Sequence, residues 1–117
     1  MDEILDLAGR LGKRLRDDER VRTMRDAGAA LDASAVDRQL LKDYEDQQQK
    51  IHDLETAGKP VEPADKRRLA DLHAQVASSA VIKAALKAQA DYAALMNTVS
   101  QRIEQEVLGR TADERRR

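Results

Sequence analysis

The sequence predicts an all-α protein, an antiparallel bundle of about five helices that ends in a long C-terminal helix. Three observations predict this class. Residues 81–108 contain no Gly or Pro and are rich in strong helix formers. The other apolar residues recur mostly at intervals of three and four, and both Pro residues fall within residues 58–63. The 117 residues suit one domain. We expect it over residues 1–109, followed by a flexible basic tail over residues 110–117.

The first predicted helix covers residues 2–16. Its acidic residues precede its basic ones, the order that the helix dipole favours. An acidic cluster follows at residues 17–19, where we expect Asp17 to cap a new helix or to mark a bend. A metal site is the other interpretation of such a cluster, but adjacent carboxylates at a helix start are more often caps. The apolar residues of the first helix share one face: Ile4, Leu7, Ala8, Leu11 and Leu15.

The second helix is predicted over residues 21–31 and the third over residues 36–54. Ser34 or Asp32 is expected to cap the third helix, because hydroxyl and carboxylate side chains accept from the free N–H groups at a helix start. Gln48 falls on the apolar stripe of the third helix, so we expect its amide to need a hydrogen-bonding partner.

The stretch around Gly58 is the clearest break in the chain. Gly58 can end a helix in the left-handed conformation, and Pro60 prevents the helix from continuing. Pro63 suits the first turn of a fourth helix, which carries Leu69 and Leu72. The loop is short, so we expect the third and fourth helices to fold back antiparallel.

The long helix over residues 81–108 has two apolar rows. One narrow row follows alternate spacings of four and three: Ile82, Leu86, Gln89, Ala93, Met96, Ser100, Ile103 and Val107. A second row runs beside it: Val81, Ala85, Ala88, Tyr92, Leu95 and Val99. The first half of the helix is therefore apolar over a broad face and should sit deep against neighbouring helices. The second half keeps only a narrow row, which suits one partner helix. The helix is either a core helix of its own bundle or pairs, at its exposed end, with another subunit. The expected partner surface consists of Leu86, Gln89, Met96, Ile103 and Val107.

Composition limits the classes of function. Charged residues make up 37% of the chain and aromatic residues only 2%, so small side chains must supply the core. Such a core buries little area, which favours a homo-oligomer. The chain has no cysteine, which excludes thiolate ligands and disulfides and fits a cytoplasmic protein. The net charge of −1 and the absence of a long apolar run predict no attraction of the whole molecule to a membrane.

No catalytic signature is present, and we expect no enzyme, no cofactor and no metal. The sequence lacks a P-loop, a GxSxG elbow and an HExxH pair. His52 and His73 lie on different predicted helices, and surface histidines are the simpler interpretation. A metal or acid–base site that joins them to nearby acids is the alternative. Direct contact with nucleic acid is not expected, although the arginines of residues 110–117 and the cations of residues 66–68 offer an alternative function in RNA binding.

The order of these features resembles the YlbF/YmcA family of small helical bacterial regulators. The residues that carry the resemblance extend over about residues 4–108: Asp32, Leu40, Leu41, Tyr44, Gln48, the loop of Gly58, Lys59 and Pro60, Leu69, Leu72, and the stretch from Val81 to Val99 after Ser78 and Ser79. The resemblance implies an oligomeric, non-enzymatic accessory protein that binds other proteins, in known cases acting with RNase Y in mRNA processing. Some members help to hold iron–sulfur clusters through cysteines, and this chain has none. The aromatic residues common on the second and last helices of the family are replaced here by residues such as Met24 and Ala85.

Overall fold

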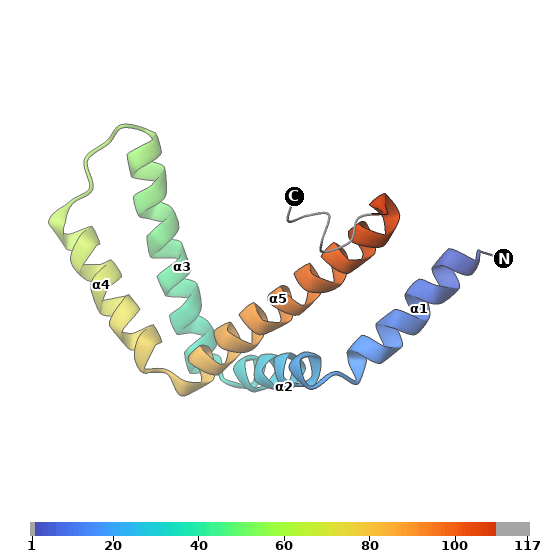
Figure 1. Cartoon of the computed structure of the whole chain (residues 1–117). Coiled ribbons are helices and arrows are strands. Elements are labelled where there is room, and N and C mark those ends of the chain that lie inside the picture. Colours follow the sequence, from blue (N-terminus) through green and yellow to red (C-terminus); the bar gives the residue numbers. More distant parts are fainter. Residues whose placement is uncertain (1, 110–117) are drawn as a thin grey trace. The chain divides into compact units, whose positions relative to one another are not determined.

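A computed structural model of the chain describes residues 2–109, which form five helices and no strand. The predicted all-α class and the long C-terminal helix are therefore confirmed. Figure 1 shows the helices in chain order. Their bounds are α1 Glu3–Arg16, α2 Glu19–Ala33, α3 Ala35–Thr56, α4 Pro63–Ser78 and α5 Ala80–Leu108.

The helices belong to two compact units, and α2 and α5 each contribute to both. One unit holds Arg25–Lys87, which comprises most of α2, all of α3 and α4, and the start of α5. The other joins the described residues up to Met24 with those from Ala88 onwards. The predicted tail over residues 110–117 lies outside the described residues. Among the described helices, none combines the length and the apolar character that a membrane span requires.

The α3–α4 hairpin is the centre of the first unit (Figure 1). Gly58 has a φ of 71°, as its predicted role at the end of α3 requires. The amide of Lys59 donates to the carbonyl of Leu54 at 2.9 Å, and the amide of Gly58 donates to that of Glu55 at 3.1 Å. These two bonds form a Schellman motif, which satisfies carbonyls that the end of the helix leaves free. Pro63 then occupies the first turn of α4, so the chain reverses as predicted.

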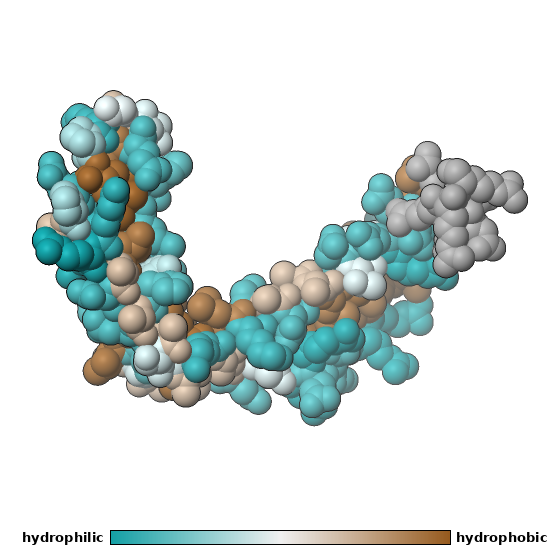
Figure 2. Space-filling model, turned by 60° about the vertical axis from the view of Figure 1, so that its left-hand side comes forward, coloured by the Kyte–Doolittle hydropathy of each residue, from teal (hydrophilic) through white to brown (hydrophobic). Residues whose placement is uncertain are grey.

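Side chains of α3 and α4 pack along the length of the hairpin. Leu72 and Val76 of α4 are buried. Figure 2 shows hydrophobic residues gathered along this hairpin between hydrophilic ones. The half-buried apolar side chains that complete this packing are Leu40, Leu41, Ile51, Leu54 and Leu69. Burial of these side chains, more than intrinsic helix propensity, holds two helices of this length together.

The expectation about Gln48 is wrong, because the neighbouring glutamine turns inward. Gln48 is exposed, whereas Gln47 is only 5% exposed. The Gln47 amide nitrogen donates to the carbonyl of Asp65 at 3.0 Å, which satisfies its buried donor. Lys50 reaches the carboxylate of Asp65 at 2.9 Å from the next turn of α3. The side chains of α3 therefore tie it to the first turn of α4 through polar contacts as well as apolar ones.

The start of α2 lies beside α5 in the second unit. Val21 of α2 and Ala88 and Leu95 of α5 are buried there. Asp18 caps α2, because its carboxylate accepts from the backbone amide of Arg20 at 2.8 Å. Of the two roles expected for Asp17, a cap of the new helix or a bend, the structure shows the bend. Asp17 ends α1.

Candidate protein-interaction surface

The α5 helix contributes two rows of apolar side chains, and they differ in burial. The predicted row that begins at Val81 faces the interior. Ala88 and Leu95 are buried, and Val81, Ala85, Tyr92 and Val99 are half-buried. In the first row, Ile82 is fully buried and Met96 is half-buried. Leu95 is the last buried residue of the helix, so the final turns of α5 lie outside the core.

We call the five predicted partner residues of α5 the α5 seam. Leu86, Ile103 and Val107 are 51%, 50% and 76% exposed, and Gln89 is also exposed. Met96 is half-buried beside the core row. Leu86 belongs to the unit of Arg25–Lys87 and the other four to the second unit. The structure therefore presents most of the α5 seam to solvent, and its role as a partner surface stays a prediction.

The end of α5 carries an ion pair beside this apolar row. Leu108 is 53% exposed next to Val107. Arg102 and Glu106 form an ion pair of 3.0 Å between exposed side chains one turn apart. Such a pair contributes little stability in water. Burial of the apolar side chains of the last turns would contribute more free energy than this ion pair.

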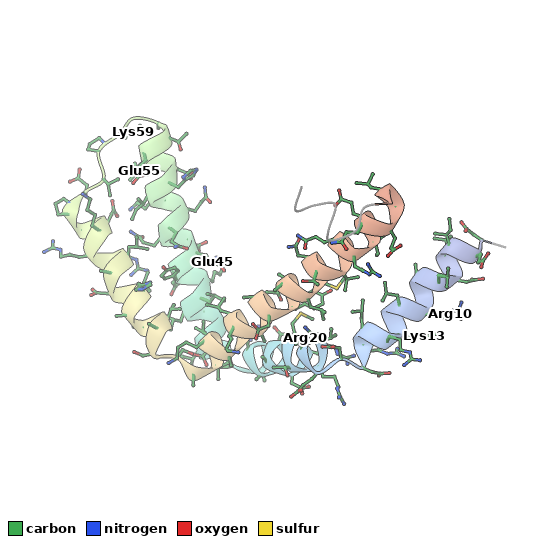
Figure 3. All side chains as sticks on the ribbon, in the orientation of Figure 1. Arg10, Lys13, Arg20, Glu45, Glu55 and Lys59 are labelled. Atoms are coloured by element: carbon green, nitrogen blue, oxygen red, sulfur yellow. The ribbon has the colours of Figure 1, made fainter. Side chains whose placement is uncertain are left out.

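A second apolar surface lies on α1, although the sequence predicts only an ordinary amphipathic helix there. No residue of α1 is buried. Ile4 and Leu5 are 76% and 67% exposed, Leu7 and Leu11 are also exposed, and Leu15 is half-buried. The signal was present in the regular spacing of these residues, but spacing alone does not say whether another helix covers a face. Figure 3 shows Arg10 and Lys13 on the same helix, and both are exposed.

Arg20 connects the cap of α2 to the neighbouring part of α5. Its guanidinium makes two bonds of 3.0 Å to the two carboxylate oxygens of Asp18. This side-chain bond and the backbone amide of Arg20 lower the pKa of Asp18 to about 2. The same pairing raises the pKa of Arg20, with a smaller electrostatic contribution from Asp91 of α5. Arg20 and Asp91 line a shallow depression with Ala94, Leu95 and Thr98.

Asp37 connects the starts of α3 and α5. It accepts a hydrogen bond from the Ser34 hydroxyl at 2.6 Å and from the Ser79 hydroxyl at 2.8 Å. Ser34 and Ser79 are the capping residues of these helices, and Ser79 also accepts from the amide of Ile82 at 3.1 Å. The bond from Ser34, followed by that from Ser79, lowers the pKa of Asp37. All its carboxylate contacts are explained by capping, so this cluster is structural.

The two histidines do not meet in a common site. The Nδ1 atom of His73 lies 3.0 Å from the Tyr44 hydroxyl, with the two rings tilted by 38°. His52 is exposed on α3. No group of three or more His, Cys, Asp or Glu side chains suited to a metal ion occurs among residues 2–109. His73 therefore serves the α3–α4 contact, and the expectation of a chain without metal or cofactor stays a prediction.

A sequence profile of the family described as control of competence regulator ComK, YlbF/YmcA, matches residues 4–107. Neither the comparison with curated proteins nor that with solved structures gives a significant match. The profile covers all five helices, apart from the first residue of α1 and the last of α5. The chain therefore belongs to the YlbF/YmcA family, which is linked to control of the competence regulator ComK.

Proposed function

We propose that this protein is a non-enzymatic regulator that binds other proteins through the exposed end of the α5 seam. The observation that carries the proposal is the exposure of Ile103 and Val107 in the turns that follow the last buried residue of α5. Residues four apart on a helix lie on one face, so these two side chains form a narrow apolar strip. A helix of this kind suits an apolar groove or a second helix on a partner.

The regulatory role of the family supports a partner within a regulatory assembly. We propose an RNase Y-type ribonuclease as this partner, with the chain as its accessory subunit in mRNA processing. Contacts at the centre of an interface supply most of its binding energy when they are large, apolar and desolvated on binding. Ile103 and Val107 fit that description better than the paired charges of Arg102 and Glu106 beside them.

The test compares two double variants in binding to the purified ribonuclease of the native host. Ile103→Gln with Val107→Gln keeps good helix formers but removes the apolar strip. Asn97→Ala with Gln101→Ala changes two exposed polar positions of the same helix and serves as the control. We expect the first variant to weaken binding by about tenfold or more and the control to bind like the wild type.

Circular dichroism of both variants checks that α5 remains helical. Equal binding by the wild type and the Ile103/Val107 variant would overturn the assignment of this surface. No binding of the ribonuclease by any of the three proteins would overturn the assignment of the partner. The wild type and the Ile103/Val107 variant can also be purified from the native host together with the proteins that they bind. If both bring down the same proteins, the proposed role in protein binding through this strip is wrong.

A further inference from the structure

The N-terminal helix α1 has an apolar face that its own unit leaves in solvent. Every described apolar side chain from Ile4 to Leu11 is exposed, and Leu15 is half-buried. An isolated helix of 14 residues is only marginally stable in water, because its few backbone bonds barely offset the cost of nucleation. Contact of this face with another helix would therefore stabilise α1 as well as remove its apolar side chains from water.

The same compact unit contains the exposed end of the α5 seam. Ile103 and Val107 are 50% and 76% exposed, in turns that follow the last buried residue of the helix. Two helices of one unit thus each present an apolar stripe to solvent. Contact between the two stripes would be favourable, because it removes the apolar area of both from water at once.

The connection between α1 and α2 keeps the end of α1 close to α5. Only Asp17 and Asp18 separate the two helices. Arg20, in the first turn of α2, lines a shallow depression with Leu95 and Thr98 of α5. From there α1 can reach about 21 Å, whereas the rest of α5 extends about 15 Å beyond Thr98. Rotation of the backbone at the two aspartates is therefore sufficient for α1 to cover the whole end of α5.

The apolar intervals of the two helices match when α1 lies antiparallel to α5. Away from the bend, the stripe of α1 has intervals of four, three and four residues: Leu15, Leu11, Ala8 and Ile4. In the same direction α5 has the same intervals: Met96, Ser100, Ile103 and Val107. Such positions form the layers of an antiparallel helix pair. Leu11 then meets Ser100 and Ala8 meets Ile103, so both central layers join a small side chain to a large one.

The positions beside the two stripes bring no like charges together. Four pairs flank the stripes in this register: Leu7 with Glu106, Arg14 with Val99, Leu5 with Glu104 and Gly12 with Asn97. The stem of Arg14 can lie along Val99 while its guanidinium stays in water. Asp6 and Lys13 fall on the face of α1 opposite the stripe, so they take no part in the contact. Apolar burial alone therefore favours the pairing, and electrostatic repulsion between the flanking residues does not oppose it.

We propose that α1 is an intramolecular strap, which rotates at Asp17 and Asp18 and covers the exposed end of the α5 seam. This inference rests on the proposed function, because the strap occupies the surface assigned to the partner. A segment of the same chain competes at a high effective concentration. The apparent affinity for the partner therefore falls with the fraction of chains whose seam is free. The arrangement with α1 in solvent is the form that binds, and the closed arrangement is the inhibited form.

A disulfide tests the contact without any partner, because the chain has no cysteine of its own. Leu11→Cys with Ser100→Cys should form a bond within one chain on mild oxidation, since the two positions share a layer. Gly9→Cys with Ser100→Cys is the matched control and should stay reduced, because Gly9 lies outside the stripe and has space for a side chain. Non-reducing electrophoresis and mass spectrometry distinguish bonds within a chain from bonds between chains. No bond in the first variant, bonds only between chains, or equal bonding in the control would overturn the proposal.

Binding to the purified ribonuclease of the native host then tests the inhibition. The oxidised Leu11/Ser100 variant should bind at least about tenfold more weakly than the same protein after reduction. Ile4→Gln with Leu11→Gln, in the chain without cysteines, should bind about threefold more tightly than the wild type or better, because the strap is weakened. Arg10→Gln with Lys13→Gln, two exposed polar positions of the same helix, is the control and should bind like the wild type.

The two readouts separate failure of the strap from failure of the proposed partner. Equal binding by the oxidised and reduced forms would overturn the proposal, because α1 would then leave the partner surface free. If the ribonuclease binds neither the reduced variant nor the wild type, the partner assigned to the α5 seam is wrong. The disulfide within one chain still decides in that case whether α1 closes over α5.

Discussion

Asp37 accepts hydrogen bonds from two serines that begin different helices, and no interval in the sequence marks the three residues as neighbours. Ser34 lies three residues before Asp37 and Ser79 lies 42 residues after it. Ser34 was one of two expected caps of α3, and the structure places Ser79 at the start of α5. The carboxylate that joins them was not expected. A cap is recognised from local sequence, but a shared acceptor depends on which helix starts come together.

Asp18 provides the residue-scale prediction. Its pKa is lowered from 3.8 to about 2 by the side chain and then by the backbone amide of Arg20, so the folded state favours the charged form. A lowered pKa stabilises the fold above the unfolded pKa, and this stabilisation is lost as the pH falls through the folded pKa. The melting temperature should therefore fall between about pH 4 and pH 2, in part because of Asp18.

The measurement follows the melting temperature across this range for the wild type and for Asp18→Asn. The variant should show a weaker decline, because its side chain does not titrate. Asp17→Asn, a change of the adjacent exposed carboxylate, is the matched control. An identical decline for Asp18→Asn and the wild type would contradict the assignment of this stabilisation to Asp18.

At the scale of elements, the boundaries of the helices follow from local chemistry. Gly58 and Pro63 mark the reversal between α3 and α4, and the structure places both as the sequence predicts. The expectation that Gln48 is buried was wrong, because the adjacent Gln47 lies near the edge of the same stripe and is the one that turns inward. One residue changes direction by about 100° on a helix, and only the position of α4 decides which amide is buried.

Gly58 provides the element-scale prediction, with a second glycine as its control. Gly58→Ala should destabilise the protein by about 1–2 kcal/mol, because a side chain is strained at a φ of 71°. Gly28→Ala, inside α2, should stabilise it by up to about 1 kcal/mol, since no atom lies within 4 Å of the added carbon. Urea unfolding of the two variants measures both changes in the free energy of unfolding. Changes of the same sign would contradict this prediction.

At the scale of the whole molecule, the chain buries few large side chains. Ile82 is the largest fully buried residue among those described. The other buried apolar residues are Val21, Leu72, Val76, Ala88 and Leu95. Small and medium side chains dominate this set, as the low aromatic content predicts. Truncating one side chain of such a small core should therefore remove a large share of the free energy of unfolding.

Ile82→Ala tests this view of the core. Removing a buried isoleucine side chain typically costs about 2–5 kcal/mol, through lost burial and the cavity that remains. Val36→Ala, at a position that is 80% exposed, should change the stability by less than about 0.5 kcal/mol. Chemical denaturation of both variants gives the comparison. A cost for Ile82→Ala no larger than that for Val36→Ala would mean that the core lies elsewhere.

The sequence by itself determined the all-α class, the five helices, the long final helix and the reversal at Gly58, because these depend on propensity, periodicity and turn chemistry within a few residues. Only the tertiary structure decided which apolar faces are covered. Ile82 and Ile103 lie in the same predicted row of α5, yet one is fully buried and the other is half exposed. The apolar spacing of α1 is as regular as that of α5, but none of its residues is buried. Burial depends on which helices pack together, and residues far apart in the chain make that choice.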